Sequence, residues 1–143
     1  MVKAADAAIE FTNAFVDFVQ LSMSNAPATK NYEQKLILDC ANGVGAIPMS
    51  TMVKSLRGIL DIELVNTNTD NFELLNEGCG AEFVHKEVKL PAGVDESSPK
   101  KAAAFDGDAD RLMYFKNNGL MPIIIDGDKQ FSLIMLYVTG LLK

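Results

Sequence analysis

Three aspartates alternate along five residues in the second half of the chain, and an arginine follows them directly: Asp106, Asp108, Asp110 and Arg111. In extended backbone, alternate side chains point to the same side, so these carboxylates would lie together. Carboxylates that close repel one another unless a cation lies among them or some are protonated. Carboxylate oxygens suit magnesium or calcium rather than zinc. The spacing therefore predicts a divalent-metal site, beside which Arg111 offers a charged fork suited to phosphate oxygens.

The pattern alone also suggests three other interpretations of the aspartate run. A calcium EF-hand loop needs glycine at its sixth position and glutamate at its twelfth. Counting from Asp106 places Arg111 and Asn117 there, so the EF-hand is rejected. A phosphatase with Asp106 as the covalent nucleophile stays open, because a strand preceding the loop would suit it. A solvated acidic turn that binds nothing also stays open.

The remaining polar motifs carry weaker signals. Asp126 and Asp128 resemble a second metal loop, but they precede a helical segment and are better explained as a turn and an N-cap. Residues 43–46 lack the third glycine of a dinucleotide fingerprint, although backbone N–H groups at a helix start favour anions. His85 is the single histidine of the chain, and no role is assigned to it.

Composition limits the classes of function. A length of 143 residues suits one domain, and a net charge of −6 argues against a nucleic-acid partner. The most apolar run, residues 131–142, falls short of the roughly 20 residues that cross a bilayer. Cys40 and Cys79 lack metal or redox spacing and are expected to be buried thiols. Because the first residues do not resemble a signal peptide, a cytoplasmic location without a membrane partner is expected.

Strand and helix patterns alternate around the aspartates. Residues 36–41 read as a buried strand, residues 48–56 as a helix and residues 62–66 as a second strand, which together have the length of a βαβ unit. Two further strands, at 112–116 and 121–125, are separated by a hairpin signal that contains Gly119.

Three further segments are predicted to be regular secondary structure outside the βαβ unit and the hairpin. Residues 4–24 have the periodicity of an amphipathic helix, and residues 81–85 read as a short strand. A final helix over 129–142, capped by Asp126 or Asp128, is apolar nearly all round. Such a helix is either buried in the core or packs against something beyond this chain, and the pattern alone leaves both open.

Four segments together resemble the α-D-phosphohexomutases. Residues 104–111 (AFDGDADR) are similar to the metal loop of that superfamily. Residues 38–46 (LDCANGVGA), 75–84 (LNEGCGAEFV) and 125–129 (IDGDK) narrow the resemblance to its eukaryotic phosphoacetylglucosamine mutases. The resemblance extends from about residue 30 to the end of the chain, and the motifs occur in the order found in the family.

This resemblance implies an α/β fold, in which residues 1–143 form a three-layer α/β/α domain with a mixed, mostly parallel central sheet. The domain would be the second of four around a cleft, and the chain would be a fragment of a longer enzyme. The implied cofactor is Mg²⁺, with Asp106, Asp108 and Asp110 as its protein ligands and Arg111 as a catalytic residue beside the phosphoryl group.

The implied reaction interconverts N-acetylglucosamine 6-phosphate and 1-phosphate through a phosphoserine and a bisphosphate intermediate, for UDP-N-acetylglucosamine synthesis. The serine loop, the sugar-recognition segment and the C-terminal phosphate loop of the family are absent from this sequence. We therefore expect missing domains to supply the phosphoserine and to bind the phosphosugar substrate, and the isolated chain to be inactive. A phosphoglucomutase or phosphomannomutase domain, a stand-alone metal-binding module and a small phosphatase remain alternatives.

Overall fold

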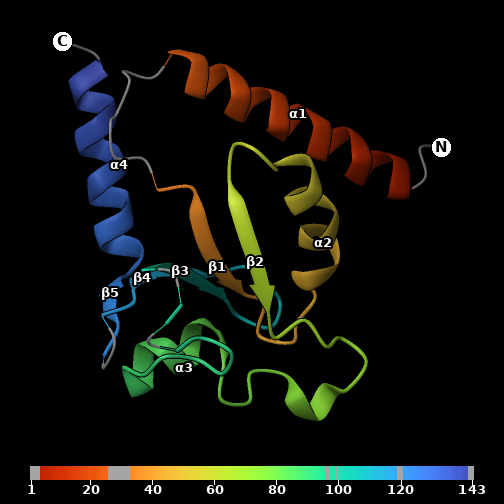
Figure 1. Ribbon diagram of the computed structural model, residues 1–143, viewed down its shortest axis with the longest axis vertical. Helices are drawn as coiled ribbons and strands as arrows, with labels where there is room; N and C mark the ends of the chain where they lie inside the picture. The colour runs from red at the N-terminus through yellow and green to blue at the C-terminus, as the bar shows by residue number, and fades with distance from the viewer. Residues whose placement is uncertain (1–3, 26–32, 96, 99, 119–120, 142–143) are drawn as a thin grey trace.

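Five strands form one sheet within the residues that the structure, a computed structural model, describes: 4–25, 33–95, 97–98, 100–118 and 121–141 (Figure 1). The strands are β1 (Lys35–Asp39), β2 (Asp61–Val65), β3 (Lys101–Phe105), β4 (Leu112–Lys116) and β5 (Ile123–Ile125). They lie in the order β2-β1-β3-β4-β5. β1 is parallel to β2 and β3, whereas β4 is antiparallel to both β3 and β5. The predicted α/β fold with a mixed, mostly parallel sheet is confirmed.

Helices cover both faces of this sheet and complete the three layers. α2 (Ala46–Ser55) connects β1 to β2 and packs against β2, and α1 (Ala4–Asn25) lies beside α2 (Figure 1). α3 (Gly80–Glu87) packs against β3 and β4. A short 3-10 helix, Phe72–Leu74, lies in the connection that leads to α3. α4 (Gly127–Leu141) follows β5 and contacts both β5 and β4.

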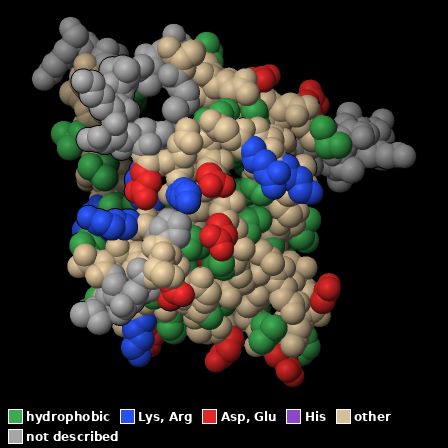
Figure 2. All heavy atoms as spheres, viewed as in Figure 1, with side chains coloured by type: hydrophobic (Ala, Val, Ile, Leu, Met, Phe, Trp, Pro, Cys, Tyr) green, Lys and Arg blue, Asp and Glu red, His purple; other side chains and the backbone are tan. Residues whose placement is uncertain are grey.

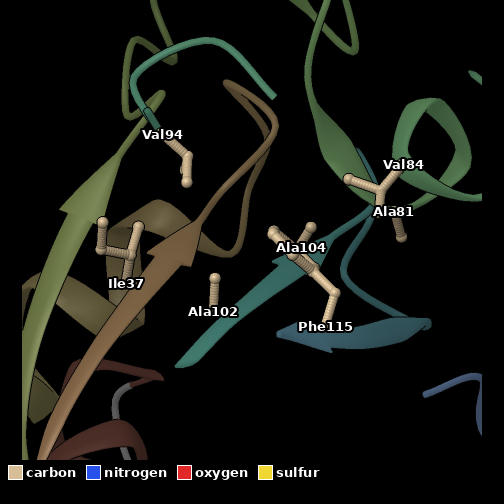
Figure 3. Packing of buried hydrophobic residues seen from close by; sticks show 7 residues of the cluster. All are labelled: Ile37, Ala81, Val84, Val94, Ala102, Ala104 and Phe115. Carbon is tan, nitrogen blue, oxygen red and sulfur yellow. The ribbon is translucent and has the colours of Figure 1, made fainter. Parts of the chain in front are cut away.

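Alternate residues of β1 and β3 face opposite layers, as period-two strands require. Ile37, Ala102 and Ala104 join the core cluster on the α3 face, whereas Leu38 and Ala103 join the cluster on the α2 face. Figure 3 shows the first cluster, in which Ala81 and Val84 of α3 lie close to Ala104 and Phe115. β1 and β3 are therefore held from both sides, and the loops that follow them begin from fixed positions.

The prediction of a short strand at residues 81–85 was wrong, because these residues lie in α3. Gly80, with φ of +88°, and Cys79, the N-cap residue, turn the chain into the helix. Ala81 and Val84 are buried three residues apart on its inner face. The spacing of these buried residues is that of a helix packed on the sheet rather than that of a strand.

The C-terminal hairpin follows the prediction with small shifts. β4 and β5 pair in the antiparallel sense, but β5 begins at Ile123 rather than at residue 121. Gly119 of the expected turn lies outside the described residues. Asp126 rather than Asp128 accepts a hydrogen bond from the Lys129 backbone N–H, at 3.0 Å, and caps α4.

α4 is not a core helix. Its large apolar side chains are exposed along its whole described length, from Phe131 at 64% to Leu136 at 71% and Tyr137 at 62%. This rules out burial within the described part of the chain as the reason for its apolar composition. In the same part of the chain, every helix falls short of the length or the apolarity that a membrane crossing needs. On the face shown in Figure 2, acidic and basic side chains are interspersed rather than gathered into one patch.

Candidate metal centre

The aspartate loop begins at the carboxyl end of β3. The parallel strands β1 and β2 have their carboxyl ends at the same end of the sheet. Asp106 follows the strand directly and is buried, with 3% of its surface exposed, whereas Asp108 and Asp110 are exposed. Ala109 adopts a left-handed conformation, φ 60°, and its N–H donates to the Asp106 carbonyl oxygen at 3.1 Å. This tight turn folds the later aspartates back toward the first.

The turn gathers the three predicted ligands. Each of Asp106, Asp108 and Asp110 offers a carboxylate oxygen, and these oxygens all lie within 4.8 Å of one another. Among the described residues, no other group of three or more acidic, histidine or cysteine side chains is so placed. A set of hard oxygens, open to solvent on one side, fits an Mg²⁺ ion that takes its remaining ligands from water or from a phosphate.

Arg111 is fastened to the first of these aspartates. Its side-chain Nε donates to Asp106 Oδ2 at 2.6 Å, and its backbone N–H donates to Asp106 Oδ1 at 3.1 Å. Its guanidinium also lies 3.8 Å from Asp110 Oδ1 and 4.0 Å from Glu82 Oε2, yet 61% of the arginine side chain is exposed. The site thus orients Arg111 and still leaves it accessible to a phosphorylated ligand.

The pKa values of Asp106 and Asp110, at the two ends of the loop, are shifted in opposite directions. Burial raises the pKa of Asp106, but the hydrogen bonds and positive charge of Arg111 outweigh burial and leave that pKa below its ordinary value. The negative charges of Asp108 and Asp106 raise the pKa of Asp110. As pH falls, Asp106 therefore stays ionised to a lower pH than an ordinary aspartate, and Asp110 takes up a proton before an isolated aspartate would.

We expect the affinity of the chain for Mg²⁺ to decline as pH falls, beginning above the range in which an ordinary aspartate titrates. The sign follows from the raised pKa of Asp110, since a proton bound there removes one ligand charge. Calorimetric Mg²⁺ titrations over a series of pH values would measure the decline. Asp110→Asn, which cannot bind this proton, should bind more weakly but show a flatter upper part of the profile. Profiles of the same shape in both proteins would contradict the assignment.

Glycines bring a second loop into backbone contact with the aspartates. The Val44 N–H donates to the Gly107 carbonyl oxygen at 3.0 Å. A Cβ added to Gly43 would lie only 2.2 Å from the same oxygen. Asn42, beside Gly43, donates through Nδ2 to the Leu74 carbonyl oxygen at 3.0 Å and holds the neighbouring loop. The loop after β1 therefore contacts the aspartate loop through its backbone and contributes no charged side chain to the site.

Two carboxylates near the site were not predicted from the sequence. Asp39 is buried at the end of β1, and a carboxylate that closes an apolar strand just before a glycine turn was the available signal. Glu82 lies on α3 opposite Arg111, and it was missed because this segment was predicted to be a strand.

Cys40 and Cys79 are the expected buried, unpaired thiols. Burial and the Asp39 charge raise the pKa of Cys40 to about 12 and that of Cys79 to about 11.

Comparison with known proteins places the chain in a family. Residues 7–113 match the family model described as phosphoacetylglucosamine mutase AMG1, domain II. Phosphoacetylglucosamine mutase 2 of Schizosaccharomyces pombe is 38% identical over 115 residues, which are 80% of this chain and 21% of that protein. The Arabidopsis thaliana phosphoacetylglucosamine mutase is 43% identical over 108 residues, 73% of this chain and 19% of that protein.

Solved structures show the same likeness. An N-acetylglucosamine-phosphate mutase in its product complex superposes with a TM-score of 0.82 at 32% identity, over 92% of this chain and 25% of that one. Aspergillus fumigatus N-acetylphosphoglucosamine mutase, in complex with GlcNAc-6P and magnesium, gives 0.70 at 30% identity, over 82% and 23%. This chain thus spans about a fifth to a quarter of the length of these relatives. It belongs to the phosphoacetylglucosamine mutase family of the α-D-phosphohexomutase superfamily, and the matched residues correspond to domain II of that family.

Proposed function

We propose that this chain is the magnesium-binding domain of a mutase that interconverts N-acetylglucosamine 6-phosphate and N-acetylglucosamine 1-phosphate. The observation that carries the proposal is the gathering of three carboxylate oxygens within 4.8 Å, beside an accessible arginine. The structure of the Aspergillus fumigatus relative is a complex with magnesium, which supports the same metal here. The phosphoserine and the sugar-binding groups would come from the rest of a four-domain enzyme, of which this chain is one α/β domain. The product of the whole enzyme would serve UDP-N-acetylglucosamine synthesis in the cytoplasm.

The residues of this chain would share the work of binding a phosphoryl group. A bound Mg²⁺ would supply positive charge against the phosphoryl oxygens during the transfer. Asp106, Asp108 and Asp110 would hold that ion. Arg111 uses Nε for Asp106, so its terminal nitrogens are the donors available to a phosphate oxygen. Fixing these donors before the reaction avoids reorganising them while the charge develops.

Titration with Mg²⁺, followed through the backbone amides of residues 105–112 by NMR, tests the metal site directly. We expect saturable shifts in these amides, because three carboxylates of the loop face one ion. Asp108→Asn should lose the shifts at the same Mg²⁺ concentrations. It is a well-matched control, since Asp108 is exposed and its replacement should leave the fold intact. Wild-type shifts that are absent, or equal shifts in the variant, would refute the assignment of these ligands.

Activity assays separate the mutase domain from the phosphatase alternative. The isolated chain should neither interconvert the two N-acetylglucosamine phosphates nor hydrolyse a chromogenic phosphate ester, since its loop is proposed to hold metal rather than to attack phosphorus. Hydrolysis that disappears in Asp106→Asn would instead establish a phosphatase with Asp106 as its nucleophile.

A further inference from the structure

The buried carboxylate of Asp39 binds three N–H groups that belong to three different segments. Asp39 is 0% exposed at the end of β1. Its Oδ1 accepts from the Ala41 backbone N–H at 2.9 Å and from Asn66 Nδ2 at 2.9 Å. Its Oδ2 accepts from the Gly80 backbone N–H at 2.6 Å. One side chain thus joins the loop after β1, the loop after β2 and the start of α3.

All three of its partner residues have left-handed backbone conformations. The φ angles are 55° at Ala41, 51° at Asn66 and 88° at Gly80. Ala41 gains nothing from such a conformation by itself, and asparagine tolerates it only moderately. Backbone of this kind persists where the surroundings hold it in place, and it gathers at functional sites. The hydrogen bonds to Asp39 join these three turns, together with backbone hydrogen bonds such as the one from the Asn42 N–H to the Asn66 carbonyl oxygen at 2.7 Å.

Segments next to these turns contact the aspartate loop. The loop that starts at Ala41 donates the Val44 N–H to Gly107. The Ala41 carbonyl oxygen accepts from the Asn76 N–H at 3.0 Å, and a Cβ on Gly107 would lie 2.8 Å from Asn76 Nδ2. A Cβ on Gly80 would lie 3.2 Å from the carbonyl oxygen of Phe105. Gly107 is therefore packed between Val44 and Asn76, which are connected to Asp39 through Ala41.

Burying a carboxylate at this position has a cost in free energy. Burial raises the pKa of Asp39, and its three hydrogen bonds offset that effect only in part. A buried charge without a cation partner is costly unless hydrogen bonds satisfy it, and the three N–H groups supply these hydrogen bonds to Asp39. What the carboxylate offers is the ability to accept three N–H groups at fixed angles, which an apolar side chain lacks.

We propose that Asp39 is a positioning residue for the metal centre, which fixes the turns around Gly107 and so sets the spacing of Asp106, Asp108 and Asp110. The role of the metal rests on the proposed function. The positioning itself is a property of the metal-free chain, so it has a test of its own.

Asp39→Asn supplies that test, because asparagine keeps the size and one acceptor but turns an NH₂ group toward N–H donors. In the metal-free variant, we expect hydrogen exchange at the Val44 and Ala109 amides to accelerate roughly tenfold as the loop contacts loosen. In the same variant, the affinity for Mg²⁺ should fall between roughly 10- and 100-fold, as it does when groups that orient ligands are removed. Val84→Ala is the matched control, since Val84 is equally buried, at 0% exposure, but belongs to the core on the α3 face.

The outcomes separate the two proposals. Unchanged exchange at Val44 and Ala109 in Asp39→Asn, or equal changes in Val84→Ala, would overturn the role of Asp39, whatever the metal does. If wild-type chain binds no Mg²⁺ while Asp39→Asn still loosens the loop, the proposed function fails and the positioning stands. Should Asp39→Asn not fold, Asn66→Gly replaces it, because glycine accepts the left-handed backbone and removes a single donor to Asp39. It should accelerate the same two amides by a smaller factor, and wild-type exchange there would equally overturn the proposal.

Discussion

Asp106→Asn should lower the affinity for Mg²⁺ by about 100-fold or more, which is at least as much as the loss of a group that only orients metal ligands produces. The expected effect is large because Asp106 has two roles. It is the one buried member of the three, and it holds Arg111 through both carboxylate oxygens. Its pKa lies below the ordinary value, so it is ionised at neutral pH. Calorimetric Mg²⁺ titration at neutral pH would measure the loss.

Asp110→Asn is the matched comparison for that variant, since it makes the same chemical change at the other end of the loop. Asp110 is exposed and its pKa is raised, so we expect a smaller loss of Mg²⁺ affinity, roughly tenfold. The order of the two variants is the decisive point. Equal losses, or a larger loss in Asp110→Asn, would mean that burial and the Arg111 contact do not rank the ligands as the structure indicates.

The sheet and the aspartate loop could be predicted because their signals are local. β1 contains a short apolar run, and β2, in which apolar and acidic residues alternate, follows it after a helical segment. Three aspartates two residues apart need only one turn to meet. The turn itself depends on Ala109 in a left-handed conformation, which nothing about alanine indicates. The chemistry of the site was thus visible in the sequence, whereas the backbone conformation that assembles it was not.

The surroundings of the loop could not be predicted because they depend on residues far apart in the chain. The hydrogen bond from Gly80 to Asp39 joins positions 41 residues apart, and the one from Asn66 joins positions 27 apart. Each partner is ordinary in its own segment, and α3 itself was mistaken for a strand because eight residues carry little helical periodicity. Only the paired sheet brings these segments to one edge and gives Asp39 its partners.

Gly43→Ala should be the most destabilising change beside the metal site, although it adds a single methyl group and changes no charge. The added Cβ would lie 2.2 Å from the Gly107 carbonyl oxygen and 2.7 Å from the Gly107 Cα. Backbone cannot move aside as the end of a flexible side chain can, so the two loops must separate. Forced overpacking costs typically about 1–3 kcal/mol and sometimes more, and we expect a loss of unfolding free energy of about 3 kcal/mol.

Urea denaturation followed by circular dichroism would measure that loss, and Mg²⁺ titration of the folded variant should show a weakened site as well. Gly127→Ala is the control, because a Cβ there meets nothing within 4 Å, and its effect on stability should stay within about 1 kcal/mol. If Gly43→Ala were no less stable than Gly127→Ala, the contact between the two loops would not be close in solution. A variant that is destabilised but binds Mg²⁺ normally would show that the aspartate loop keeps its shape without this support. A joint loss would instead mean that stability and metal binding depend on the same backbone contact, so that the glycine turn after β1 belongs to the metal centre as much as the aspartates do.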